Sequence, residues 1–97
     1  MISRLTGTQR SAVKSYRSNG KKLLDVEYDD QPVLNDVVDG MRVISTDRRS
    51  AEEYALFLLE PDGRVGCYVL DETYIVGRVS GFDTLPEAVS AWHDGEI

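Results

Sequence analysis

The chain has 97 residues, which is enough for one hydrophobic core, and we expect a single α+β domain over residues 1–97. Hydrophobic residues make up 41% of it, yet no apolar run is long enough to span a membrane or to resemble a secretory signal, so we expect a cytoplasmic protein. The single cysteine, Cys67, excludes an intramolecular disulfide and fits a reducing compartment.

The net charge of −6 is unevenly distributed along the chain. Residues 1–24 carry six basic and no acidic side chains, whereas residues 25–97 carry 17 acidic and five basic ones, a net charge of −12. Such a division indicates either a charged partner or attraction between the two parts of the chain.

The first predicted element is a helix over residues 8–18. Thr6 and Gln9 have the spacing of a capping box, and Gly20 is a suitable helix stop. Basic side chains recur at intervals of 4, 3 and 4 residues and so form a stripe along this helix. The stripe consists of Arg10, Lys14, Arg17 and Lys21.

Residues 22–29 alternate between apolar and acidic side chains, which predicts a strand with one solvated face. Residues 32–39 are expected to form a short helix, because apolar residues recur there at helical spacing and Gly40 follows. A bent strand is the alternative for 32–39. Carboxylates are concentrated in this part of the chain: Asp25, Glu27, Asp29, Asp30, Asp36 and Asp39.

Residues 41–46 have the composition of a further strand, and the polar segment 47–53 follows it. Ser50 and Glu53 in that segment have the spacing to cap a single helical turn. Arg48 and Arg49 lie in the same segment, and arginines in loops either anchor interfaces or are simply solvated.

Residues 54–71 form the centre of the predicted sheet. Two apolar runs flank Pro61-Asp62-Gly63, which predicts a hairpin with a three-residue loop. If Glu60 faces Arg64, the pairs continue as Leu59/Val65, Leu58/Gly66, Phe57/Cys67, Leu56/Tyr68 and Ala55/Val69. Both faces of the hairpin are then mostly apolar, as in strands that are covered on both sides.

Residues 72–80 are expected to form the next strand, joined to the hairpin by a tight turn near Asp71-Glu72. A helix follows, with Thr84 as its N-cap, Glu87 at the third position of a capping box, and Gly95 as its stop. The stretch FDTLPEA at 82–88 resembles the junction of sheet and trailing helix in small α+β domains, some antitoxins among them.

These elements predict an antiparallel sheet of about five strands with an N-terminal and a C-terminal helix packed on it. Two helices do not necessarily cover both faces of the hairpin. Apolar sheet surface left uncovered would then bind a second copy of the chain or a protein partner.

No set of residues with catalytic or metal-binding spacing occurs in the sequence. Cys67 is expected to be a packed core residue, and His93 lies near the end of the last helix, where a cation suits the helix dipole. One cysteine and one histidine are too few for a zinc site, and neither a calcium-binding loop nor a glycine-rich phosphate-binding loop is present. We therefore expect a protein that is not an enzyme and uses no cofactor or metal.

Two surfaces remain as candidates for function. The carboxylates at 25–39 either form a solvated sheet face or imitate the charge of a nucleic-acid backbone and bind a basic groove on a larger protein. The leading hypothesis is therefore an acidic inhibitor or adaptor, such as a phage anti-CRISPR or anti-restriction protein or an antitoxin. The alternative is a regulator that binds nucleic acid through the basic stripe of the first helix.

Overall fold

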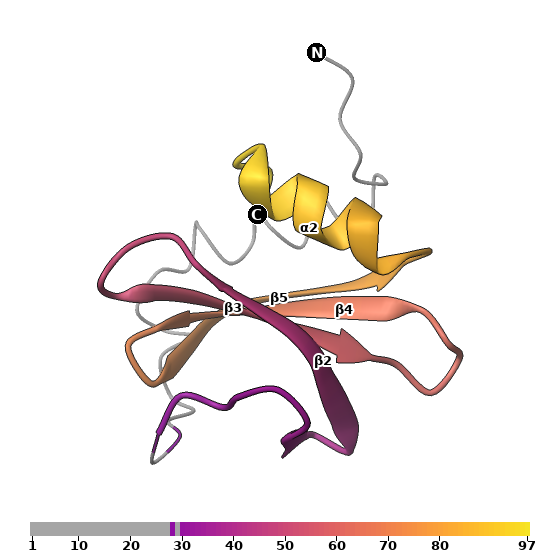
Figure 1. The fold of residues 1–97 in the computed structure, drawn as a ribbon, viewed down its shortest axis with the longest axis horizontal. Coiled ribbons are helices and arrows are strands. Elements are labelled where there is room, and N and C mark those ends of the chain that lie inside the picture. The colour runs from indigo at the N-terminus through magenta and orange to yellow at the C-terminus, as the bar shows by residue number, and fades with distance from the viewer. Residues whose placement is uncertain (1–27, 29) are drawn as a thin grey trace.

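A computed structural model describes Tyr28 and residues 30–97, which form a five-stranded antiparallel sheet and one helix (Figure 1). The predicted helix over 8–18 and almost all of the predicted strand over 22–29 lie outside the described residues. The strands follow one another in the sheet in the order β1-β2-β3-β4-β5. The elements are β1 (Val37–Val38), β2 (Met41–Arg48), β3 (Glu53–Leu59), β4 (Val65–Asp71), β5 (Tyr74–Phe82) and α2 (Leu85–His93).

The central hairpin is confirmed residue by residue. β3 and β4 pair in the predicted register, from Leu59 opposite Val65 to Ala55 opposite Val69. The loop is closed by a hydrogen bond of 2.9 Å from the Glu60 amide to the Arg64 carbonyl, and Gly63 has a φ of 85°. The Pro61-Asp62-Gly63 loop agrees with this register, because the turn type and loop length of a hairpin determine which residues face each other.

The predicted helix over 32–39 is wrong. Residues 34–35 form a turn, and the chain then enters the short strand β1, so the bent-strand alternative was closer. Asn35 has a φ of 74°, which no right-handed helix accommodates, and Asp39 and Gly40 have φ values of 52° and 77°. Two consecutive residues with positive φ make the tight turn of a β1–β2 hairpin, and this Asp-Gly signal outweighed the helical recurrence of apolar residues.

β5 extends two residues beyond the predicted end of its strand, to Phe82. Its pairing with β4 shifts between Val65 and Cys67, where Gly81 adopts a φ of 82°. The Glu60 carboxylate accepts a hydrogen bond of 2.8 Å from the Gly81 amide and so supplies an acceptor at this irregularity. The predicted turn between β4 and β5 is confirmed, with Asp71 opposite Tyr74.

The C-terminal helix is confirmed as α2. The Thr84 hydroxyl accepts a hydrogen bond of 3.3 Å from the Glu87 amide, as the capping signal predicted. After the helix, Gly95 has a φ of 76°, and its amide and that of Glu96 donate to the carbonyls of Trp92 and Ala91. This is the Schellman arrangement that ends many helices. No helix in the described part of the chain is long and apolar enough to cross a membrane.

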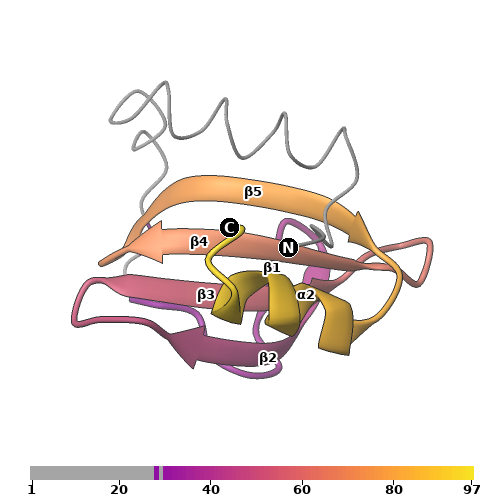
Figure 2. The same cartoon turned by 90° about the horizontal axis from the view of Figure 1, so that it is seen from above.

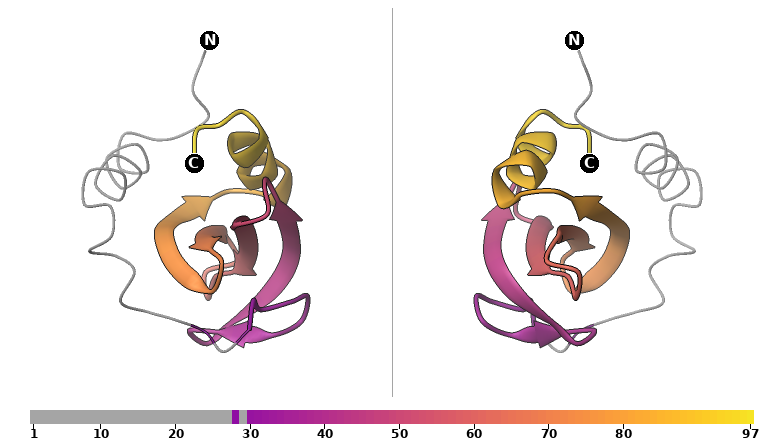
Figure 3. Two further views of the ribbon diagram at one scale, coloured as in Figure 1. Left: turned by 90° about the vertical axis from the view of Figure 1, so that its left-hand side faces the viewer. Right: turned by 90° about the vertical axis from the view of Figure 1, so that its right-hand side faces the viewer.

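The sheet is strongly curled and is covered on two sides by different parts of the chain (Figures 2 and 3). α2 lies over one side, and the segment 30–40 lies over the opposite side (Figure 3). We call the apolar cluster under α2 the helix-side core and the cluster next to the segment the segment-side core. The helix-side core contains Ala55, Phe57, Val65, Cys67, Val69, Val79, Phe82, Ala88, Ala91, Trp92 and Ile97. The segment-side core contains Val38, Val43, Tyr54, Leu56, Leu58, Tyr68, Leu70 and Ile75.

Candidate functional site

Three of the six predicted acidic site residues lie in the described part of the chain: Asp30, Asp36 and Asp39, all exposed on the segment 30–40. Asp25, Glu27 and Asp29 lie outside it, as do the basic residues Arg10, Lys14, Arg17 and Lys21. The structure therefore places half of the predicted acidic surface and none of the predicted basic stripe.

Asp36 and Asp39 also hold their own segment in place. One carboxylate oxygen of Asp36 accepts a hydrogen bond of 2.8 Å from the Val33 amide. Asp39, in a left-handed conformation, accepts a hydrogen bond of 2.5 Å from the Tyr68 hydroxyl. Both residues accept these hydrogen bonds while they are exposed at the surface.

A group of aromatic and charged side chains surrounds Asp39. Arg78 lies over the Tyr68 ring, with 5.2 Å from its guanidinium carbon to the ring centroid. Burial raises the pKa of Tyr68, and the hydrogen bond and charge of Asp39 raise it further, whereas Arg78 opposes them. Burial also raises the pKa of Tyr28, and the charge of Asp39 raises it further. Asp39 and Arg78 thus place one negative and one positive charge around these two tyrosines.

A second acidic group, which the sequence reasoning missed, lies at the end of the sheet where β2 leads into β3. The Glu72 amide donates to the Glu52 carbonyl at 2.7 Å, and Asp71 pairs with Glu53 across the β3–β4 ladder. Gln31 joins this end by donating to the Glu72 carbonyl at 2.6 Å, which brings the neighbouring Asp30 to the same end. The exposed carboxylates here are Asp30, Glu52, Asp71 and Glu72. Extending the predicted hairpin register by two pairs would have placed Asp71 opposite Glu53.

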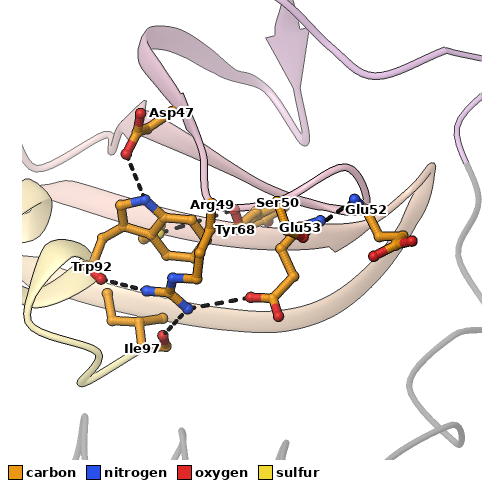
Figure 4. Close-up of polar contacts among 9 residues, drawn as sticks. Asp47, Arg49, Ser50, Glu52, Glu53, Tyr68, Trp92 and Ile97 are labelled. Carbon is orange, nitrogen blue, oxygen red and sulfur yellow. Dashed lines mark hydrogen bonds and ion pairs between the residues drawn. The ribbon is translucent and has the colours of Figure 1, made fainter.

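Arg48 and Arg49, which the sequence left as interface anchors or solvated side chains, each make internal contacts. Arg49 stacks on the Trp92 ring at 3.6 Å and donates to the carbonyls of Trp92 and Ile97 (Figure 4). Its guanidinium also lies 3.3 Å from a Glu53 carboxylate oxygen. Arg48 lies over the Tyr54 ring and donates to Gln31 at 2.6 Å. The two arginines therefore tie opposite covers of the sheet to the β2–β3 connection.

Cys67 and His93, the two candidates for nucleophilic or acid–base chemistry, lie in different surroundings in the described part of the chain. Cys67 is fully buried, and burial raises the pKa of its thiol to about 12, which fits the predicted packing role and keeps it protonated at neutral pH. His93 lies on the exposed last turn of α2 with its Nε2 3.5 Å from Asp47. The same Asp47 carboxylate accepts a 2.7 Å hydrogen bond from the Trp92 indole (Figure 4). The hydrogen bond between Trp92 and Asp47 therefore orients the indole.

Metal binding has no support among the residues that the structure describes, which contain no group of three or more histidine, cysteine, aspartate or glutamate side chains arranged to hold an ion. No family model matches the chain, and neither a curated protein nor a solved structure shows significant similarity to it. The candidate site is therefore defined by surface charge and exposure alone.

Proposed function

We propose that the protein is a non-enzymatic acidic binding module that inhibits or adapts a larger protein by occupying a basic, nucleic-acid-binding surface. Anti-CRISPR proteins, anti-restriction proteins and antitoxins are the classes of inhibitor to which such a module would belong. The binding surface would consist of the carboxylates of 25–39 together with Glu52, Asp71 and Glu72, which lie at the end of the sheet where Gln31 contacts Glu72.

The observation that carries this proposal is how the basic side chains are used. Residues 30–97 contain 14 acidic and five basic side chains, a net charge of −9. Four of the five arginines contact aromatic rings, carbonyls or carboxylates of the same fold; Arg64, for example, lies 3.7 Å from Asp83. Most of these arginines therefore make contacts within the fold, while acidic side chains outnumber basic ones among residues 30–97 and would be available to a partner.

Electrostatic attraction would bring a row of carboxylates to a basic groove on a partner. Exposed negative charges raise the association rate with a positively charged surface, and they suppress contact with negatively charged molecules such as DNA and RNA. The module would compete with nucleic acid for the groove, and its binding would weaken as salt concentration rises.

The test begins with the tagged full-length protein as bait in lysate of its host, with and without nuclease. A protein partner that survives nuclease is then purified, and its affinity is measured for the wild type and for a variant with Asp25→Asn, Glu27→Gln and Asp29→Asn. We expect weaker binding by the variant and competition by nucleic acid. Glu87→Gln, an exposed carboxylate on α2, is the matched control and should leave the affinity unchanged.

Two results would refute the proposal. If the triple variant binds the partner as tightly as the wild type, the carboxylates are only a solvated surface. If everything captured disappears with nuclease and an Arg10/Lys14/Arg17 triple alanine loses it too, the basic stripe binds nucleic acid directly.

A further inference from the structure

An aspartate followed directly by a glycine occurs three times, each time in an exposed turn. In such a pair the glycine amide nitrogen attacks the aspartate carboxyl group with little hindrance, because glycine has no side chain. The local sequence is the same in all three, so any difference in their reactivity comes from the fold. The pairs are Asp39-Gly40, Asp62-Gly63 and Asp94-Gly95.

In two of the pairs the glycine amide is held by a backbone hydrogen bond. The Gly63 amide donates to the Glu60 carbonyl at 2.9 Å, and the Asp62 carboxylate also accepts a hydrogen bond of 3.0 Å from the amide two residues further on. The Gly95 amide donates to the Trp92 carbonyl at 3.2 Å, within the Schellman ending of α2. Each nitrogen is therefore released only when a backbone contact breaks.

The third pair, in the turn between β1 and β2, is held differently. Among the residues that the structure describes, the Gly40 amide donates to no carbonyl, and the space beside its Cα is open. Asp39 has a φ of 52°, a conformation that L-residues rarely adopt. Its carboxylate is restrained by the 2.5 Å hydrogen bond from the Tyr68 hydroxyl. The nitrogen of this pair is thus free, and one side-chain contact restrains the carboxyl group.

We propose that Asp39 is a modification site at which isoaspartate forms without an enzyme, and that the Tyr68 hydroxyl slows the reaction. The Gly40 nitrogen bonds to the side-chain carboxyl carbon of Asp39, and the carboxyl OH and the amide hydrogen leave as one water. Hydrolysis of the resulting five-membered succinimide returns the water. When it breaks the bond between the Gly40 nitrogen and the main-chain carbonyl carbon, the chain continues through the side chain of residue 39, and the main-chain carboxylate is free.

This modification would change how the segment 30–40 is fastened to the sheet. The turn between the paired Val38 and Met41 would contain one additional backbone atom. The free carboxylate would lie on the Cα of residue 39 and not at the end of its side chain, so the acceptor for Tyr68 is displaced. The inference goes beyond the proposed function and does not depend on it.

The test incubates the full-length protein at physiological temperature, folded in neutral buffer and unfolded in concentrated urea. Trypsin separates the three pairs into the peptides 23–42, 50–64 and 79–97, in which chromatography and electron-transfer mass spectrometry locate isoaspartate. In the folded protein we expect position 39 to react roughly fivefold faster than positions 62 and 94, the factor that one net hydrogen bond supplies. In urea the three rates should be similar, since only the fold distinguishes the pairs.

Tyr68→Phe tests the restraint on the carboxyl group. It should raise the rate at position 39 by roughly fivefold and leave positions 62 and 94 unchanged, which serve as internal controls. Equal rates at the three positions of the folded wild type, or a faster rate at 62 or 94, would overturn the assignment of Asp39. An unchanged rate at 39 in Tyr68→Phe, or a rise at all three positions, would show that the hydroxyl does not slow the reaction locally.

Discussion

The two covers of the curled sheet are built in different ways. α2 buries Ala88, Ala91 and Trp92 in the helix-side core and begins and ends with regular capping contacts. The segment 30–40 turns only Pro32 and Val38 fully inward and otherwise depends on hydrogen bonds that its carboxylates accept and its backbone makes. One cover is held by apolar packing, and the other is held by turn geometry and polar contacts.

This difference explains where the candidate surface lies. A helix that packs through one apolar stripe commits its inward positions to the core and leaves a polar outer face. An irregular segment held by its backbone places few packing demands on its side chains, so apolar and acidic residues are both accommodated on its outside. The exposed apolar residues and the predicted carboxylates accordingly occur together on the segment 30–40.

The largest expected loss of stability is for a substitution in α2, the cover held by apolar packing. Trp92→Ala should lower the free energy of unfolding by about 3–5 kcal/mol, because the indole is 1% exposed at the centre of the helix-side core. Val38→Ala on the other cover should cost less, about 1.5 kcal/mol for the two buried methyl groups that it removes. Guanidinium unfolding followed by circular dichroism measures both, because Trp92 is the only tryptophan and its removal abolishes tryptophan fluorescence. Equal costs would contradict the asymmetry between the covers.

Substitutions of the neighbouring Arg48 and Arg49 also compare the two covers, with smaller expected losses of stability. Arg49→Ala removes a stacked guanidinium and its bonds to the last residues of the chain, and we expect a loss of about 1.5–3 kcal/mol. Arg48→Ala removes the bond to Gln31 at a more exposed site, and we expect a loss of about 0.5–1.5 kcal/mol.

Hydrogen exchange read by mass spectrometry locates each effect. Exchange should rise in α2 for the Arg49 variant and in residues 30–38 for the Arg48 variant. Arg49→Lys is the matched control for charge, and it should recover only part of the stability, because lysine lacks the planar fork that reaches two carbonyls. A common pattern of exchange in both alanine variants would mean that the two covers open as one unit.

The accuracy of the sequence prediction also differs between the two covers of the sheet. The hairpin and α2 were predicted in detail because Pro61-Asp62-Gly63 and the Thr84 cap act locally, and the alternating or helical apolar pattern agrees with them. The segment 32–39 was predicted wrongly because Val33, Leu34, Val37 and Val38 happen to recur at helical spacing. Their outward members are not core residues at all, and burial is what makes apolar periodicity informative.

The candidate site was predictable only in part. The concentration of carboxylates at 25–39 is visible in the sequence, and Asp30, Asp36 and Asp39 are indeed exposed. The acidic group at Glu52, Asp71 and Glu72 forms because two turns meet at one end of the sheet. A local sequence pattern does not predict which turns meet. The roles of Arg48 and Arg49 depend on contacts 17 to 48 residues away in sequence.

The smallest expected effect concerns the polar contact that fastens the segment to the sheet. Tyr68→Phe removes the hydrogen bond to Asp39 and should lower the free energy of unfolding at neutral pH by about 0.5–1.5 kcal/mol. Asp39→Asn keeps an acceptor for the Tyr68 hydroxyl and removes the charge, so it should cost less.

The pH dependence gives this contact a distinct signature. The pKa of Tyr68 is raised in the folded protein, so its proton is lost from the unfolded chain first as pH rises above about 10. The stability supplied by the protonated hydroxyl is therefore complete below that pH and is lost as pH rises towards the folded pKa. Both variants should show a shallower alkaline loss of stability than the wild type, in urea titrations at successive pH values. Cys67 and Tyr28, whose pKa values are also raised, keep part of the slope in every variant. An unchanged slope in Tyr68→Phe would show that the hydroxyl of Tyr68 is not what fastens the segment 30–40 to the sheet.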